Sequence, residues 1–146
     1  MVKRINTKYF KWEDLEYSDT ARVNNINNTI PEKYIENGRR LILFLDKLRE
    51  AFCKPININS GYRSKDLNKA VGGSETSSHL YALAADIRPN YTEDFNQFIE
   101  FVKDYLKDKD FDQCIIERSG KSRWIHIGIE HPKYGKRKQL FEMVVH

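Results

Sequence analysis

The spacing of apolar positions predicts a long helix in the first third of the chain. Thr29 and Glu32 have the spacing of a capping box, and Pro31 suits a first helical turn, where its missing N–H costs nothing. Apolar or small residues then recur at steps of three and four, as on one face of a helix. They are Tyr34, Gly38, Leu41, Leu45, Leu48 and Phe52. We therefore expect a helix over residues 29–52 whose apolar face packs on the core.

Two further helices are indicated by caps and apolar stripes. Ser64 is a suitable N-cap for a short helix that ends near Val71, just before two glycines. After Thr92, acidic residues in a first turn precede an amphipathic stripe. The stripe consists of Phe95, Phe98, Ile99, Val102, Tyr105 and Leu106. This pattern predicts a second core helix, which ends in the polar residues 107–110.

Short runs with strand character separate and follow these helices. Residues 56–59 alternate apolar and polar side chains up to a Ser-Gly pair, and residues 84–89 end at a proline. Residues 112–118 and 123–129 are joined by a turn in which Gly120 tolerates a positive φ. With the turn centred on Gly120 and Lys121, the pattern predicts an antiparallel hairpin in which Glu117 opposes Trp124.

The two faces of this hairpin differ in character. Side chains alternate along a strand, so each face takes every second residue. One face is apolar and must be core; it carries Cys114, Ile116, Ile125, Ile127 and Ile129. The other carries Gln113, Ile115, Glu117, Trp124 and His126. Glu117 and His126 are diagonal neighbours, about 7–8 Å apart, within reach of one small ligand. A one-residue shift of the turn would bury Glu117 without a partner, which supports this register.

A candidate metal site extends beyond the hairpin. His79 and Asp86 lie seven residues apart across small and apolar residues, where polar groups are unexpected. With His126 they form two imidazoles and one carboxylate, a set that leaves a fourth zinc position for water, as in catalytic zinc sites. Glu117 would then be a carboxylate beside that water. Spacing alone leaves this interpretation and that of ordinary packed histidines open.

Composition places the chain among ordinary folded proteins. Its 146 residues are 40% hydrophobic and 12% aromatic, which favours one domain over residues 1–146 and excludes disordered and collagen-like classes. No apolar run approaches the roughly 18–20 residues that span a bilayer, and no apolar segment of a secretory signal follows the amino terminus. We expect a monomer that is cytoplasmic as synthesised and has no membrane insertion.

The charged residues and cysteines add little chemistry. The net charge of +4 favours an anionic partner, but no basic run with interleaved aromatics points to nucleic acid. Cys53 and Cys114 lie in apolar runs, which favours buried free thiols over a disulfide. His131 and His146 are expected at the surface. The basic residues of 133–138 are expected to form a solvated tail or to help hold an anionic wall polymer.

Several motifs resemble one family of zinc peptidases. SSHLYALAAD at residues 77–86 resembles SxHxxGxAxD, and WIH at 124–126 resembles WxH, both motifs of the zinc D-Ala-D-Ala carboxypeptidase and L-alanyl-D-glutamate endopeptidase family. SGYRS at 60–64, LN at 67–68 and VGG at 71–73 are also similar. The resemblance covers about residues 10–140 and is to small phage and prophage members. It implies the α+β fold of this family and of the hedgehog domain, with a small, mainly antiparallel sheet flanked by helices.

The resemblance also implies roles for individual residues. His79, Asp86 and His126 would bind Zn²⁺. Arg63 would stabilise a substrate carboxylate or the oxyanion, the alternative being an ion pair with Asp66.

Ser77 would make a hydrogen bond behind the metal ligands, the alternative being an ordinary cap. Gln113, Tyr62, Trp124 and Ser77 are candidates to bind substrate, together with Tyr81, although we expect at least one of the aromatic residues in the core. The alternative for Gln113 is a structural hydrogen bond.

Two departures from the family pattern bear on activity. The motif glycine is Ala82, and the acid that many members carry three residues before the last histidine is Arg123. Arg123 cannot act as a base, so Glu117 on the preceding strand is expected to be the general base. The alternative for Glu117 is a rim carboxylate or a partner of Arg123.

The expected function is hydrolysis of peptidoglycan stem peptides by a zinc metallopeptidase. The bond would be D-Ala-D-Ala or L-Ala-D-Glu, and the protein would reach the wall after release, as an endolysin does, or in a phage particle. The alternative is a non-catalytic domain of this fold, stabilised by zinc, that binds a partner or forms part of a phage particle.

Overall fold

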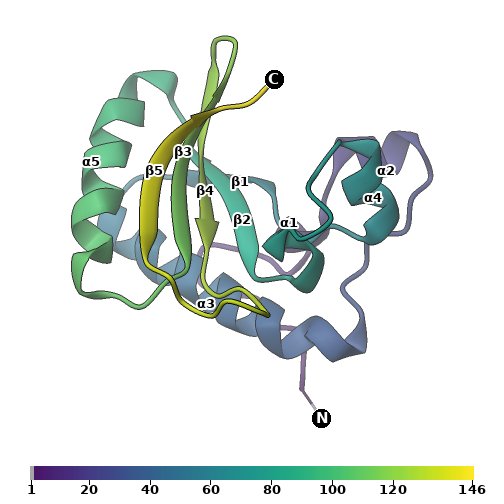
Figure 1. The fold of residues 1–146 in the computed structure, drawn as a ribbon. Helices are drawn as coiled ribbons and strands as arrows, with labels where there is room; N and C mark the ends of the chain where they lie inside the picture. Colours follow the sequence, from purple (N-terminus) through teal and green to yellow (C-terminus); the bar gives the residue numbers. More distant parts are fainter. Residues whose placement is uncertain (1) are drawn as a thin grey trace.

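A five-stranded sheet forms the centre of the protein in the computed structural model, which describes residues 2–146. Its strands, in the spatial order β1-β2-β4-β3-β5, are β1 (Ile56–Ser60), β2 (Ala84–Pro89), β4 (Ser122–Gly128), β3 (Gln113–Ser119) and β5 (Gln139–Val144). Neighbouring strands are antiparallel except β3 and β5, which run parallel (Figure 1). The α+β fold with a mainly antiparallel sheet is therefore confirmed.

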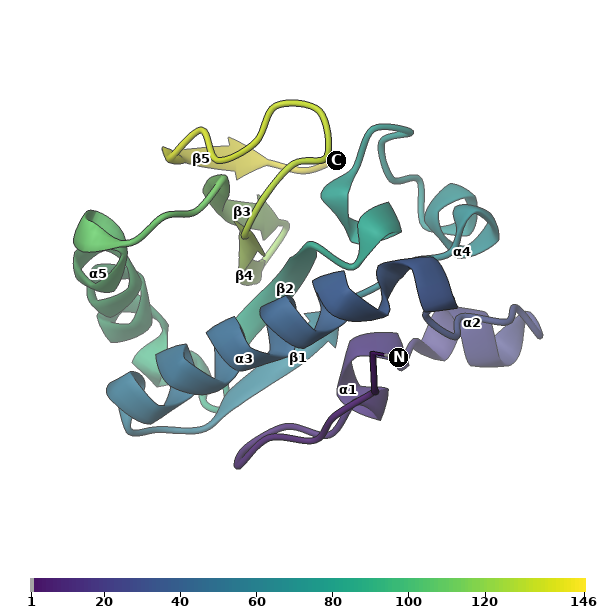
Figure 2. The same cartoon turned by 90° about the horizontal axis from the view of Figure 1, so that it is seen from below.

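Two longer helices cover one face of the sheet. α3 (Ile35–Phe52) lies lengthwise across that face and α5 (Phe95–Tyr105) packs beside it (Figure 2). Both bury the predicted apolar stripes, so their existence and orientation are confirmed. Three short helices lie on the side of the sheet where β1 forms the edge (Figure 1). They are α1 (Glu13–Glu16), α2 (Asp19–Val23) and α4 (Lys65–Ala70). Single 3-10 turns are η1 (Glu32–Tyr34), η2 (Ser78–Tyr81), η3 (Thr92–Asp94) and η4 (Leu106–Asp108).

The start of the long helix differs from the prediction. Helical turns begin only at Glu32, and the expected capping box between Thr29 and Glu32 does not form. The Glu32 carboxylate instead accepts from Arg4 at 3.4 Å, while the Ile30 N–H donates to the Glu16 carboxylate at 2.7 Å. These contacts hold the chain extended up to Pro31, so the helix starts later than the local sequence suggests.

The predicted hairpin register is confirmed. Glu117 pairs with Trp124 and Ile115 with His126, and the apolar face packs into the core beneath α3 and α5. The opposite face is thereby left for the polar side chains.

Two expectations about the surface are wrong. Cys53 is exposed at the end of α3, whereas Cys114 is buried as expected, which raises its pKa to about 12; both are free thiols. The region after residue 128 is not a tail, because it forms a loop and the edge strand β5. Among residues 2–146, no helix is long and apolar enough to cross a membrane.

Candidate functional site

Three side chains from separate elements converge on the face of the sheet opposite α3. Asp86 on β2 pairs in register with His126 on β4, and His79 reaches them from η2. Ala82 follows η2 with φ 58°, the left-handed conformation that turns the chain into β2. That conformation explains why glycine occupies this position in the family motif. One ligand atom from each of His79, Asp86 and His126 lies within 4.8 Å of the other two.

The hydrogen-bond pattern of His79 indicates a place for a cation. Its Nδ1 lies 2.6 Å from the Gly61 carbonyl, which can only accept, so Nδ1 carries the proton. The Nε2 lone pair of the neutral ring then faces Oδ1 of Asp86 at 3.2 Å. Burial lowers the pKa of His79, which disfavours a second ring proton. Two lone pairs therefore face each other, and a metal ion satisfies both.

His126 completes this donor set. Its Nδ1 lies 3.1 Å from the same Asp86 oxygen, and its ring centroid is 5.1 Å from that of His79. Burial opposes ionisation of Asp86, but the two imidazoles outweigh it and hold the pKa of Asp86 well below its usual range. Two imidazoles with one carboxylate are the donors that zinc accepts in catalytic sites, so the residues present fit a zinc ion.

Arg63 lies behind the metal-facing groups rather than beside Asp66. Its guanidinium donates to Asp86 Oδ2 at 3.2 Å, to the Ser60 hydroxyl at 3.0 Å and to the Asn68 side-chain oxygen at 3.2 Å. A Cβ at Gly73 would lie 2.0 Å from that Asn68 oxygen and 2.9 Å from Arg63, so this backbone must be glycine. The three hydrogen bonds fix the orientation of the Asp86 carboxylate.

Glu117 lies beside the three converging groups. Its Oε1 is 3.8 Å from Nδ1 of His126, and its side chain is 13% exposed. Burial and then the negative charge of Asp86 raise the pKa of Glu117, while His126 and Trp124 oppose this rise. A carboxyl group with a raised pKa beside such a cluster is better suited to accept a proton than an ordinary surface carboxylate.

Arg123 takes no part in this arrangement. Because residues alternate along β4, it points to the face opposite His126, where it donates to Asn96 at 3.1 Å and stacks on Phe95. It is therefore not a partner of Glu117.

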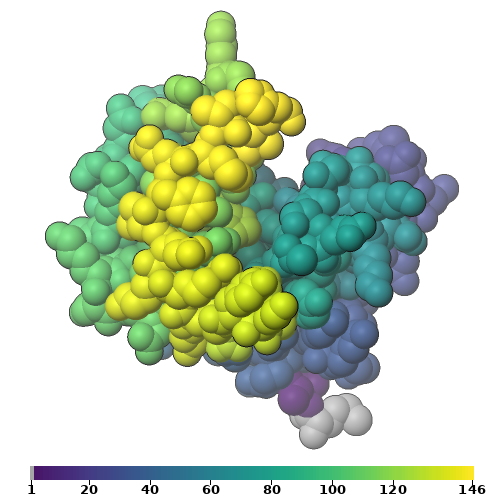
Figure 3. Space-filling view, viewed as in Figure 1, coloured from purple at the N-terminus to yellow at the C-terminus, as the bar shows by residue number. Residues whose placement is uncertain are grey.

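A groove of about 590 Å³ surrounds the converging side chains. In Figure 3 the surface is hollowed between the teal segment near residue 80 and the yellow carboxy-terminal segment. Of the expected substrate-binding residues, Ser77, Gln113 and Trp124 line the groove. Tyr62 does not, because it is only 7% exposed and packs in the core.

Two of these groove residues are held by hydrogen bonds of their own. The Ser77 hydroxyl accepts from the His79 N–H at 3.2 Å, and the Gln113 amide donates to Gln139 at 2.9 Å. Ser77 thus fixes the turn that carries His79.

Residues after 128 contribute a wall of the groove that sequence reasoning missed. His131 donates to the Thr76 carbonyl at 3.1 Å and so joins this segment to the loop before His79. Arg137, expected in a solvated tail, makes two hydrogen bonds of 2.7 and 2.9 Å to the fully buried Asp112. The remaining members of this wall are Tyr134, Met143 and Val145. The available signal was weak, because Leu140 and Val144 are apolar as well as the odd-numbered Phe141, Met143 and Val145.

Comparison with known proteins identifies one family. The family model described as Peptidase M15 matches residues 8–128, which include every element of the site except the wall after residue 128. A search of curated proteins gives no significant match.

Proposed function

The chain belongs to the M15 peptidase family, and on that premise we propose that it is a zinc metallopeptidase that hydrolyses peptidoglycan stem peptides at a D-Ala-D-Ala or L-Ala-D-Glu bond. One observation carries this proposal. The His79 and His126 nitrogens face one Asp86 oxygen, with the carboxyl group of Glu117 3.8 Å from His126. This arrangement supports the assignment of a proton acceptor beside a three-ligand zinc set.

His79, Asp86 and His126 would hold the zinc ion. When bound, zinc supplies a Lewis acid that polarises the scissile carbonyl and lowers the pKa of a water toward about 7. Glu117 accepts the proton of the attacking water and donates it to the leaving amine. Its raised pKa suits both steps, because the group must hold the proton briefly and then release it.

Arg63 acts mainly by holding Asp86 in place. Each of the three guanidinium nitrogens already donates to an acceptor within the protein. The guanidinium is therefore not available for a bidentate pair of hydrogen bonds to a substrate carboxylate. The second N–H groups of the terminal nitrogens remain to face the groove. We therefore assign Arg63 a positioning role, with charge stabilisation as a secondary one.

The test compares the wild type with Glu117→Gln. Both proteins should contain about one zinc per chain, and only the wild type should release fragments from purified peptidoglycan, as measured by mass spectrometry. Glu142→Gln is the matched control, because Glu142 lies on the opposite face of β5 and should leave hydrolysis unchanged. Metal-free protein at neutral pH, or a fully active Glu117→Gln, would refute the proposal. The masses of the fragments also identify the bond.

A further inference from the structure

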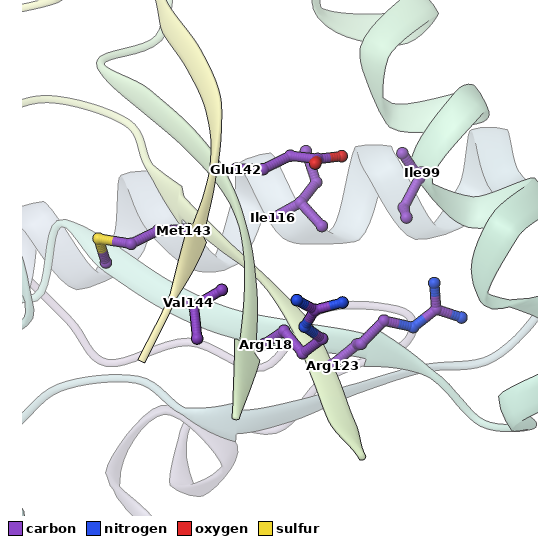
Figure 4. A pocket seen from close by; sticks show the side chains of 7 residues that line it. All are labelled: Ile99, Ile116, Arg118, Arg123, Glu142, Met143 and Val144. Atoms are coloured by element: carbon purple, nitrogen blue, oxygen red, sulfur yellow. The ribbon is translucent and has the colours of Figure 1, made fainter. Parts of the chain in front are cut away.

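β5 directs a row of apolar side chains to the same face of the sheet as Glu117. In the parallel register, Phe141 pairs with Ile115 and Met143 pairs with Glu117. Side chains of paired residues share a face, so Phe141, Met143 and the following Val145 lie on the groove side. Figure 4 shows Met143 pointing to the other side of β5 from Glu142, which faces Ile99 of α5.

Met143 and Val145 belong to an apolar wall of the groove, which differs from the set of residues after 128 described above. Ile115, Trp124, Met143 and Val145 all line it, next to Glu117. Met143 is 43% exposed, so a substantial part of its surface is available to a ligand. The opposite side of the groove is polar, since serine and threonine residues of 74–78 and Arg63 line it. A peptide lying across the site therefore meets two chemically different walls.

The position of the wall follows from the strand order. β2 and β4 carry Asp86 and His126, β3 carries Glu117, and β5 comes next. A ligand group that contacts Met143 thus lies beyond Glu117, on the side away from the metal-facing carboxylate. For a peptide whose scissile carbonyl lies at the three converging groups, a side chain next to that bond would reach this position.

The wall is held firmly enough to select a ligand. The Val145 N–H donates to the Arg118 carbonyl at 2.7 Å, and the Gln113 amide donates to Gln139 at 2.9 Å. At the start of the strand, Arg137 is fixed by the buried Asp112. The segment also lies outside residues 8–128, the part of the chain that matches the family model.

We propose that the apolar wall formed by Ile115, Trp124, Met143 and Val145 binds an apolar side chain of the substrate peptide beside the scissile bond. This inference rests on the proposed function, because it assumes that a peptide occupies the groove. Each further methylene group buried against such a wall should tighten binding about fourfold.

The experiment measures binding without hydrolysis. Zinc-loaded Glu117→Gln is titrated with acetylated tripeptides. In one series the first residue is Gly, Ala or Leu, and in a second series the second residue is varied in the same way, so that the varied residue lies on either side of the bond between them. We expect affinity to rise from Gly to Ala to Leu at one of these positions. Combining Met143→Ala and Val145→Ala should flatten this ranking, and Met143→Gln alone should weaken it while its circular dichroism spectrum stays unchanged.

Leu140→Ala is the matched control. Leu140 is 42% exposed on the same strand but belongs to the opposite face, so its loss should preserve the ranking. Equal affinities for all peptides would contradict the proposed role of the apolar wall. An unchanged ranking after removal of the Met143 side chain would contradict it as well. Wild-type protein without hydrolytic activity but with ranked binding would overturn the proposed activity instead, so the two failures are distinguishable.

Discussion

Asp86 uses its two carboxylate oxygens for different partners. Oδ1 faces both imidazoles, at 3.2 and 3.1 Å, whereas Oδ2 accepts from Arg63 at 3.2 Å. A carboxylate held in this way keeps one oxygen directed at the two imidazoles. Mutation of a group that orients a metal ligand typically lowers metal affinity 10–100-fold.

Replacing Arg63 with methionine should therefore weaken zinc binding by roughly 10–100-fold. The long apolar side chain keeps most of the volume but removes all three hydrogen bonds of the guanidinium. Competition with a chromophoric chelator measures the change. Arg88→Met is the control, since Arg88 lies two residues along the same strand and is exposed; an equal loss there would argue against the orienting role of Arg63.

Individual site residues were predictable where their chemistry is unusual for their surroundings. His79, Asp86 and Glu117 are polar groups in apolar or strand-forming stretches, and each lies at the groove. The partner of Arg63 was not predictable, because Asp66 is near in sequence whereas Asp86 becomes a neighbour only through the pairing of β1 with β2. Tyr62 lies in the core, as was expected for at least one of the three aromatic candidates, but the sequence did not indicate which one.

At the level of elements, α3 ends in a conformation that its sequence does not favour. Cys53 follows the helix with φ 64°, and its N–H donates to the Arg49 carbonyl at 3.1 Å. Left-handed backbone costs a residue with a Cβ about 1–2 kcal/mol, whereas glycine adopts it freely.

Cys53→Gly should accordingly raise the free energy of unfolding by about 1 kcal/mol, after the loss of chain entropy is subtracted. Since Cys53 is exposed, little burial is lost. Urea denaturation followed by circular dichroism measures the change. Cys53→Ala removes the thiol but keeps the strain, so it should stay within about 0.5 kcal/mol of the wild type. A similar gain in both variants would mean that the thiol, not the backbone, is responsible.

Elements with a strong contrast between faces were predictable, and β5 was not. The hairpin of β3 and β4 has one face that is apolar except for Arg118 and Arg123 near the turn, and it has a turn glycine; together these determine its register. Both faces of β5 are exposed, so neither face has to be uniformly apolar. Its sequence therefore shows little contrast between the two faces. Its partner β3 also runs parallel to it, and a parallel pair lacks the tight turn that would signal it.

On the scale of the whole molecule, one buried ion pair joins β5 to the rest. Asp112 is fully buried, and Arg137 supplies its partner through a side chain and a backbone N–H. Burial alone would raise the pKa of Asp112, but the hydrogen bonds of Arg137 outweigh this and lower it.

Arg137→Met should destabilise the protein by about 3–5 kcal/mol at pH 7, because it leaves a buried carboxylate without a partner. The pKa of Asp112 in the folded protein lies below its unfolded value of about 3.9. The ion pair with Arg137 therefore stabilises the fold fully above about pH 4, and this contribution is lost as the pH falls through the folded-state pKa. The difference between wild type and variant should therefore shrink below about pH 4. Lys136→Met, an exposed neighbour, should show neither effect in the same urea titrations.

Metal removal should also act on the whole molecule. The three proposed ligands come from segments that meet only in the folded sheet, so zinc should bind the folded chain far better than the unfolded one. At a free zinc concentration of 100 times Kd this adds about 2.7 kcal/mol, or roughly 5–10 °C in Tm. A chelator should reverse the gain in thermal melts. His79→Ala should show no response to zinc; a zinc-dependent Tm in that variant would locate the ion elsewhere.

The edge position of β5 has a consequence for how such proteins diversify. Side chains that touch the core cannot change singly without loss of stability, but those of β5 are largely exposed and pair with the sheet through their backbone. Mutations along this strand can therefore accumulate one at a time while the metal-facing residues stay intact. Under the proposed function, substitutions along β5 would alter substrate preference without touching the residues assigned to bind zinc.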